Sequence, residues 1–580
     1  MPLLPPSSRE DLVNAATHHF LLITSTAPRV HAEARRLCAA FRETKPLPST
    51  TLFYDPRAML PRAMSARVEG RGRLTLTRDM LGVSPLYYRA VPGGWACATR
   101  VALLRRLSPR IDAVLKSHLS INLLNLDGLV DSWESVWDGI YRVPPGATLT
   151  FAPGLVAPLR GERVDPAIKD WDERAYSATR FLGELRGALD RAGEPDAPLA
   201  ISSGVDSTLL GMLSRHGARK DAPFASISYP GFPRADETRD VKRIARALEK
   251  PLLLWDATSS RPASLEGLAG LEAFVDDMPH MHPGAHYEVA FDRWLHEQTG
   301  ATHKISGAIG DQLMDVPDYW VIRQLLRARP STQRDRELRF WFERAPASVL
   351  RHVVGSSPIG QSIRARRSTR GVRLLEHFPA WRGVIPEDVV LPDVLSDGMS
   401  ARARASVRPH ASALSHTLRS WRWELNMREL RIHHTKSPLQ GIFPFLDEQL
   451  WEWMLAAPPW LLLGGSDMEP GRLRDKRLLR RAHALEGALP ANIAWRGKAA
   501  FLESFVHASM SQEGFPLLEQ WSADMALEDA GVLERGATSR LLSRIARGGV
   551  SLDVIWSPVA GLWSIFALER WVRKLSLSIV

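Results

Sequence analysis

The segment Ile201-Ser202-Ser203-Gly204-Val205-Asp206-Ser207-Thr208 decides the predicted fold of this chain. It continues the apolar run PLAIS (198–202), typical of a buried strand, and leads into TLLGMLSRHG (208–217), typical of a helix. Small residues at such a turn let backbone N–H groups approach phosphate oxygens, and the positive end of the helix dipole attracts the same anion. Asp206 cannot bind phosphate directly, so we expect it to hold Mg²⁺ that bridges the phosphates. An ordinary strand-to-helix turn with a Ser/Asp cap would fit this segment, taken alone, equally well.

Strands and helices alternate after this segment. The runs FASISY (224–229) and KPLLLWD (250–256) are typical of buried strands, and the residues between them include a helical pattern at about 237–248. Strands that alternate with helices imply a parallel sheet with both faces covered. A charged helical stretch at about 171–192 precedes this region, and the chain beyond about Tyr319 is mainly helical. We therefore predict an α/β domain with a parallel sheet and a helical C-terminal part.

The first part of the chain has a different pattern. Short β-like runs, LTLT (74–77), PLYYRAV (85–91) and ATLTF (147–151), are separated by Gly/Pro turns. These runs predict a mostly strand-built domain. Because 580 residues exceed the size at which one core keeps growing, two or more domains are expected. We place them at 1–165 and 166–580.

Bulk composition excludes several classes of protein. Hydrophobic residues make up 45% and charged residues 24%, so the chain is predicted to be globular rather than disordered. The net charge of +11 is not accompanied by any RNA- or DNA-binding module, so nucleic acid is not an expected partner. Two cysteines without zinc spacing suggest a reducing compartment, which favours a cytoplasmic location. No signal segment or membrane anchor is expected, and the uncharged run 554–568 predicts a buried C-terminal helix.

Several motifs together resemble those of a known family. Residues 202–207 resemble the pyrophosphate loop SGGxDS of the ATP pyrophosphatase family, and the wider chain resembles the asparagine synthetase B superfamily. Residues 306–312 (SGAIGDQ) are similar to the SGxGxDE segment of that superfamily. The remaining matches, which occur in the same order, are DET at 236–238, PFLD at 444–447, KRLLR at 476–480, LP at 489–490 and WRGK at 495–498. This ordered set is more specific than any one motif.

The resemblance implies ATP and Mg²⁺ as cofactors and assigns residues to them. Asp206 and Asp311 are expected to hold Mg²⁺ on the pyrophosphate. Lys498 is expected to neutralise charge on the adenylate and on the tetrahedral intermediate that follows it. The nucleotide-binding residues implied by the resemblance are Ile201, Ser202, Ser203, Gly204, Val205, Asp206, Ser207, Ile227, Ser306 and Gly307.

The N-terminal part resembles the glutamine amidotransferase domain of the same superfamily. RDMLGVSPLYY (78–88) is similar to its RDxxGxxPLYY, and VPPG (143–146) ends the domain in the expected place. We therefore predict an α+β, Ntn-type sandwich. That domain uses an N-terminal cysteine exposed by removal of Met1, whereas Pro2 stands here, and neither Cys38 nor Cys97 can replace it. The domain is predicted to be degenerate, so the attacking amine must belong to a substrate.

The departures from the family pattern narrow the predicted reaction. Ala308 stands where asparagine synthetases have Glu and β-lactam synthetases have Tyr, which leaves the lasso peptide cyclases as the predicted branch. The expected partners are a leaderless precursor peptide, which the region 319–423 could bind, and the leader peptidase and leader-binding protein of the same pathway. A β-lactam synthetase or other small-molecule amide ligase is the alternative, and a non-catalytic ATP-binding scaffold is a third hypothesis. Ser203 replaces a Gly and Gln312 a Glu, so the Cβ of Ser203 must point away from the phosphate or the loop must shift.

Overall fold

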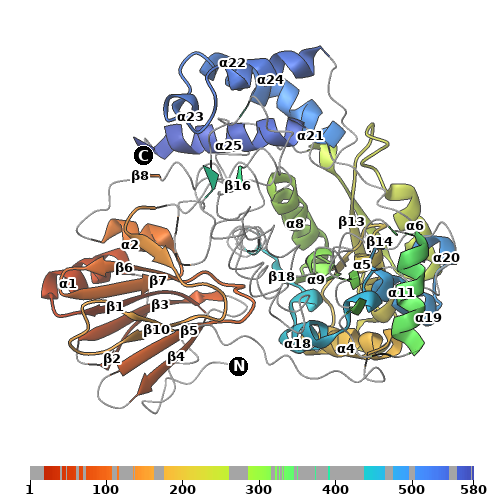
Figure 1. Cartoon of the computed structure of the whole chain (residues 1–580), viewed down its shortest axis with the longest axis horizontal. Helices are drawn as coiled ribbons and strands as arrows, with labels where there is room; N and C mark the ends of the chain where they lie inside the picture. Colours follow the sequence, from red (N-terminus) through yellow and green to blue (C-terminus); the bar gives the residue numbers. More distant parts are fainter. Residues whose placement is uncertain are drawn as a thin grey trace.

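The computed structural model describes the sandwich, the parallel sheet and most of the surrounding helices (Figure 1). The described residues are 18–39, 42–47, 49–59, 64–69, 73–107, 114–115, 133, 135, 137–161, 176–259, 285–314, 321–322, 325–326, 330, 332–344, 346, 349, 372–373, 384, 390–391, 423, 427, 437–463, 475–495, 503–547, 558–575 and 578–579. The predicted domain boundary at 165/166 and the predicted catalytic residue Lys498 lie outside these residues, as does most of the region 319–423.

The N-terminal part is a sandwich of two antiparallel sheets, one with strand order β2-β3-β1-β7-β6-β9 and one with order β11-β10-β5-β4. Alternate residues of β1 and β6 face opposite sides, as strand geometry requires: Leu22 and Tyr88 lie in the core between the sheets, and Leu21 and Tyr87 lie in the core on the other side. The strands are β1 (His18–Ser25), β2 (Arg42–Leu47), β3 (Thr50–Met59), β4 (Met64–Glu69), β5 (Arg73–Arg78), β6 (Tyr87–Val91), β7 (Gly94–Ala98), β9 (Ile140–Arg142), β10 (Thr148–Phe151) and β11 (Leu159–Gly161), with helices α1 (Pro28–Leu37) and α2 (Val101–Arg106). The sheets fit the predicted sandwich, and its descent from an amidotransferase domain stays a prediction.

The RDMLGVSP motif forms a buried loop in this sandwich. The guanidinium of Arg78 donates to the carbonyl oxygens of Ser84 at 2.6 Å, Val143 at 2.8 Å and Gly82 at 2.7 Å. Gly82 has φ +64, and a Cβ there would lie 2.5 Å from Cγ of Pro145, so only glycine fits. These contacts give the motif a structural role that needs no glutamine hydrolysis.

Asp79 in this loop should make the stability of the protein depend on pH. Burial raises the pKa of its carboxyl from 3.8 to about 6. Because the folded-state pKa is the higher one, the contribution of Asp79 to stability is fully present below the unfolded-state pKa and is lost as pH rises through about 6. The asparagine of Asp79→Asn keeps an acceptor for the Val83 N–H. We expect the free energy of unfolding of this variant, relative to that of the native chain, to rise by about 2 kcal/mol between pH 4 and pH 7. Thermal unfolding across this range measures it, with the exposed Asp221→Asn as control. A difference that does not vary with pH would contradict the expectation.

The second part contains a five-stranded parallel sheet of order β14-β13-β12-β15-β18, which confirms the predicted α/β architecture. Helices cover both faces: α4, α6, α18 and α19 contribute to one core, and α8 contributes to the other. The elements are α4 (Ala178–Arg191), β12 (Leu199–Ala200), α5 (Val205–Leu213), β13 (Phe224–Ser228), α6 (Thr238–Ala247), β14 (Leu252–Asp256), α8 (Ala285–Thr299), β15 (His303–Ser306), α9 (Gly310–Met314), α11 (Thr332–Arg344), β18 (Gln440–Ile442), α18 (Glu448–Ala456), α19 (Arg477–Glu486) and α20 (Ala491–Ala494).

The C-terminal helices pack against the N-terminal sandwich, as Figure 1 shows for α25 and its neighbours. Leu21 and Ala96 of the six-stranded sheet share one core with Leu562 and Phe566 of α25. The helices are α21 (Glu503–Ser509), α22 (Phe515–Trp521), α23 (Ala526–Asp529), α24 (Ala537–Ala546) and α25 (Pro558–Leu575), with a π-helical turn at Met510–Gly514. The predicted buried C-terminal helix is therefore confirmed. No described helix combines the length and apolarity needed to cross a membrane.

Three further contacts join the first part of the chain to the rest. Leu81 and Val83, from the RDMLGVSP loop, lie in the same core as the helices of the parallel sheet. The indole N–H of Trp423 donates to the carbonyl of Leu81, and β19 (Ser578–Ile579) pairs with β8 (Val114–Leu115). Hydrophobic cores therefore cross the predicted 165/166 boundary, so the N-terminal part supports the synthetase-like part directly.

Candidate active site

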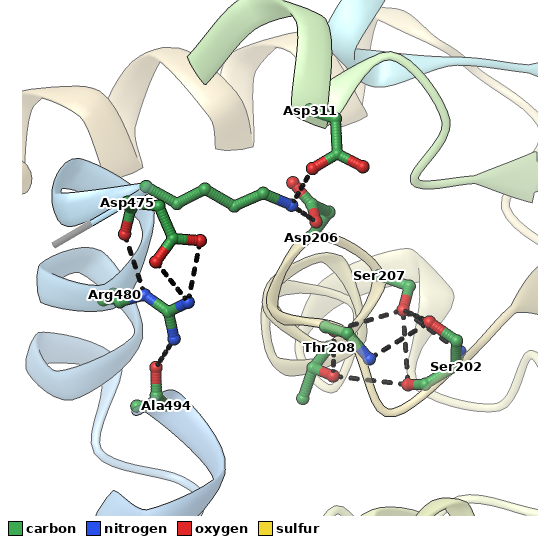
Figure 2. Close-up of polar contacts among 10 residues, drawn as sticks. Ser202, Asp206, Ser207, Thr208, Asp311, Asp475, Arg480 and Ala494 are labelled. Carbon is green, nitrogen blue, oxygen red and sulfur yellow. Dashed lines mark hydrogen bonds and ion pairs between the residues drawn. The ribbon is translucent and has the colours of Figure 1, made fainter. Parts of the chain in front are cut away.

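The predicted phosphate-binding loop lies between β12 and α5, at the carboxyl edge of the parallel sheet. Ser202 and Ser207 tie its two ends together, because the Ser202 N–H donates to Ser207 Oγ at 3.0 Å and the two hydroxyls lie 2.9 Å apart (Figure 2). Gly204 is the N-cap of α5, and its N–H donates to Ser202 Oγ at 3.1 Å. The first N–H groups of a helix have no partner within the helix, so the start of α5 presents donors suited to an anion.

Ser203 is accommodated by facing away from solvent. It is 1% exposed, its hydroxyl donates to Glu237 Oε1, and its N–H donates to Glu237 Oε2 at 3.3 Å. Glu237 is the N-cap of α6. The Ser203 side chain thus anchors the loop to α6, in line with the first of the two expected solutions, a side chain that points away from the phosphate.

Replacing Ser203 with alanine tests this anchoring role. We expect a loss of about 1 kcal/mol in the free energy of unfolding, because one hydrogen bond to a carboxylate disappears while the backbone bond remains. The rate at which the protein exchanges labelled pyrophosphate into ATP, the reaction expected of an adenylating enzyme, should change by less than about threefold. A tenfold change in rate would need a difference of about 1.4 kcal/mol in activation free energy. Chemical denaturation and the exchange assay measure the two quantities. A large loss of exchange at unchanged stability would instead place the hydroxyl on the nucleotide.

Asp206 and Asp311 meet at one atom, the ammonium nitrogen of Lys476. Lys476 Nζ contacts Asp206 Oδ2 and lies 2.5 Å from Asp311 Oδ1 (Figure 2). Asp206 is in the first turn of α5 and Asp311 in the first turn of α9, while Lys476 immediately precedes α19. Three distant segments therefore converge in front of the loop, and the structure brings together the two carboxylates predicted to hold Mg²⁺.

Two glycines allow the second motif to approach this closely. A Cβ at Gly310 would overlap Oδ1 of Asp206 and lie 2.8 Å from its Cγ, and a Cβ at Gly307 would lie 2.8 Å from the backbone N of Ser207. Between them, Ile309 has φ 73, a left-handed conformation that is unusual for a β-branched residue. Strained backbone of this kind concentrates at functional sites. The space beside the N-terminus of α5 thus depends on residues without side chains.

The carboxylate pair fits a divalent cation that also contacts phosphate. Among the described residues, Asp206 Oδ1 is buried and has no hydrogen-bond partner, so its lone pairs are unused within the protein. Mg²⁺ is commonly held by one or two carboxylates together with substrate phosphates and water, so no further protein ligand is needed. No group of three or more His, Cys, Asp or Glu side chains in the described part of the chain could hold a metal by itself. The donor set therefore suits a metal that enters with a nucleotide.

Charge in this cluster is governed by burial and by mutual contact. Burial raises the pKa of Asp206, and the Asp311 charge adds to this, while the Lys476 ammonium opposes it. Burial lowers the pKa of Lys476, but the two carboxylates outweigh it and raise that pKa overall. Lys476 is therefore cationic at neutral pH.

Arg480 positions the segment that carries Lys476. It is buried, and it donates to the backbone oxygen of Asp475 at 2.9 Å, to the Asp475 carboxylate at 3.2 Å and to the carbonyl of Ala494 at 2.8 Å (Figure 2). Lys476 itself has φ 51 and ψ 35. Lys476 belongs to the sequence motif KRLLR, from which no role for it was predicted. A cation at a helix N-terminus opposes the helix dipole, so this unfavourable position was the signal that could have pointed to a functional lysine.

The residues predicted to hold adenine and ribose lie at one edge of the sheet. Ile201 follows β12, Ile227 is near the end of β13, and Ser306 ends β15, and these three strands are parallel neighbours. Ligands bind outside the carboxyl ends of such strands. The geometry thus groups Ile201, Ile227, Ser306 and Gly307 beside the loop, and their contact with a nucleotide stays a prediction.

Neither cysteine is available as a nucleophile. Cys38 and Cys97 are both free and buried. Burial raises the pKa of the Cys38 thiol to about 12 and that of Cys97 well above its ordinary value. A thiol with so little thiolate is inert, which agrees with the expectation that neither Cys38 nor Cys97 acts as a nucleophile.

The chain was compared with models of protein families and with curated protein sequences. The model of the family described as asparagine synthase matches residues 181–573, which is more than half of the chain. The match includes β12, the loop, α5, Asp311 and Lys476, and it extends into α25. No curated protein sequence matches the chain.

Proposed function

Because the chain belongs to the asparagine synthase family, a family of ATP-dependent amide ligases, we propose that it is a lasso peptide cyclase, that is, a macrolactam synthetase. It adenylates an Asp or Glu side chain of a leaderless precursor peptide, and the N-terminal amine of the same peptide then closes an isopeptide bond. AMP and pyrophosphate are released. The partners we propose are this peptide and, in the same pathway, a leader peptidase and a leader-binding protein.

The observation that carries the ligase chemistry is the meeting of Asp206 and Asp311 before the N-terminus of α5. In the first step a carboxylate oxygen of the peptide attacks the α-phosphorus, and the bond to pyrophosphate breaks. Asp206 and Asp311 would hold Mg²⁺, which supplies neutralisation of the pyrophosphate charge. The backbone N–H groups of residues 202–207 would bind the phosphates, and Ile201, Ile227, Ser306 and Gly307 would bind the nucleoside.

In the second step the amine nitrogen attacks the activated carbonyl carbon, the bond to AMP oxygen breaks, and the amine loses a proton. Lys498 would neutralise the charge that develops on the tetrahedral intermediate and on the departing AMP. A cation held in place in a site that excludes water stabilises the transition state far more than a cation in solution does.

The identity of the amine follows from the departures in this chain. The two cysteines are buried and their thiols have raised pKa values, which argues against ammonia released from glutamine by either of them. Ala308 carries neither the Glu of asparagine synthetases nor the Tyr hydroxyl of β-lactam synthetases, and its N–H donates to Ser306 Oγ at 3.2 Å. An amine already present in the substrate is the remaining source. A small-molecule amide ligase, including a β-lactam synthetase, is the second candidate, because the same pair of carboxylates would serve the adenylation of a small carboxylate equally well.

Exchange of labelled pyrophosphate into ATP tests the proposal directly. The substrate for this test is the proposed precursor peptide, supplied without its leader. We expect exchange that depends on the peptide, and a product lighter than the peptide by one water. A peptide with an acetylated N-terminus should support exchange without ring closure, whereas replacing its acceptor Asp or Glu with the amide should abolish both.

Other results would point elsewhere. Exchange driven by a β-amino acid but not by the peptide would support the small-molecule alternative. No exchange with any carboxylate would favour a non-catalytic scaffold, and glutamine-dependent amide formation would contradict the assignment of the amine.

A further inference from the structure

Lys476 occupies the space between the two carboxylates that the proposed function gives to a metal. We infer that its ammonium is a placeholder: it keeps a divalent cation out of the nucleotide-free protein and leaves the carboxylates when the polyphosphate arrives, so that metal and nucleotide enter together. The inference rests on the proposed function only in taking Asp206 and Asp311 as the metal ligands. The contacts that carry it are those of one nitrogen with both carboxylates.

The carboxylates need a cation in either state of the site. Two like charges this close raise each other's free energy unless a positive charge lies between them. The Lys476 side chain is 15% exposed, as is that of Asp206, so water screens their interaction only in part. The Asp311 side chain is 71% exposed, so its interaction with Lys476 is screened more strongly. A lysine ammonium is a compact point charge, and it can substitute for a metal ion electrostatically.

The coordination that the lysine leaves incomplete points to a second occupant. Asp206 Oδ2 is engaged with Lys476, but Oδ1 is buried and has no hydrogen-bond partner among the described residues. A buried carboxylate oxygen without a partner is costly, and a metal ion would satisfy it. The ammonium is therefore a substitute that fits less completely than the metal.

The lysine can leave without disturbing the fold. The Arg480 contacts to Asp475 and Ala494 hold the backbone next to Lys476. The side chain has four rotatable carbon bonds, so its head group can move while this backbone stays in place. Phosphate oxygens at the N-terminus of α5 would offer the departing ammonium a new partner, which couples its movement to nucleotide binding.

Binding of Mn²⁺ to the nucleotide-free full chain, followed by the EPR signal of free Mn²⁺, tests the inference. Mn²⁺ suits carboxylate ligands and reports binding without any reaction. Two variants remove the ammonium: K476M keeps the length of the side chain, and K476G suits the positive φ at this position. Both should bind Mn²⁺ about tenfold more tightly than the native chain, because a charge-assisted hydrogen bond no longer has to be broken. The control K242M removes a charge from the exposed face of α6 and should bind as the native chain does.

The site of the added Mn²⁺ must be these carboxylates. K476G/D311N should lose the gain, and a gain that survives in this double variant would overturn the inference. Equal affinity of K476M, K476G and the native chain would also overturn it. These outcomes can be told apart from a failure of the proposed function. A gain of about tenfold in Mn²⁺ affinity without pyrophosphate exchange would contradict the proposed function but not the placeholder role of Lys476. Normal exchange without the gain would contradict the placeholder role but not the proposed function.

Discussion

Replacing Asp206 with asparagine is expected to reduce peptide-dependent ATP–pyrophosphate exchange by about a hundredfold to a thousandfold. Asparagine has almost the same shape, so the packing of α5 should be kept while one negative charge disappears from the proposed metal site. Its amide nitrogen is also a donor and cannot accept from Lys476 as the carboxylate does. The initial rate of exchange at saturating ATP, together with thermal unfolding, measures the effect.

A matched control separates this effect from a general loss of charge. Asp190 lies on the exposed side of α4, and Asp190→Asn should leave exchange unchanged. If Asp206→Asn retained more than about a tenth of the native rate, the loss of transition-state stabilisation would be less than about 1.4 kcal/mol. That result would contradict the proposed role of Asp206 in the reaction.

Replacing Gly310 with alanine is expected to reduce exchange by about a hundredfold, although it adds only a methyl group. The new Cβ would overlap Asp206 Oδ1, so the carboxylate or α9 must move. Misplacement of a catalytic group by about 1 Å is enough for a loss of this size. Steady-state exchange kinetics should show the loss chiefly in the maximal rate. The predicted nucleoside-binding residues Ile201 and Ile227 lie by other strands, β12 and β13, and should not be displaced.

Gly183→Ala is the matched control for Gly310→Ala. Gly183 lies within α4, where a Cβ would have no neighbour within 4 Å, and alanine is the better helix former. This variant should keep full activity and be slightly more stable. Native activity in Gly310→Ala would mean that the approach of α9 to Asp206 does not matter for the reaction.

Local pattern predicted the parts of the fold that depend on short stretches of chain. The parallel sheet, the loop at 202–207 and the buried helix that became α25 follow from hydrophobic periodicity and turn residues, which act over a few positions. The predicted strand at 198–202 is shorter in the structure, where β12 spans only Leu199–Ala200, because the chain turns into the loop at once. The order of motifs predicted the family, which the match over 181–573 confirms.

How the two predicted parts of the chain pack together was not predicted from the sequence. The pattern changes near residue 165, but composition along the chain does not show which surfaces pack together. Leu81 and Val83 belong to the core of the parallel sheet, and Leu21 shares a core with α25. Such contacts join residues hundreds of positions apart, and a short window of sequence contains no trace of them.

The sequence by itself predicted which residues bind phosphate and metal, because small residues, a helix start and two acidic side chains are local features. Only the tertiary structure decided that Ser203 turns to Glu237, that Gly310 makes room for Asp206, and that Lys476 lies between the carboxylates. The physical reason is that each of these contacts is set by the packing of α5, α6, α9 and α19 around one sheet. The neighbours of a side chain that come from other elements, 34 residues away for Ser203 and 270 for Lys476, depend on that packing and not on the surrounding sequence.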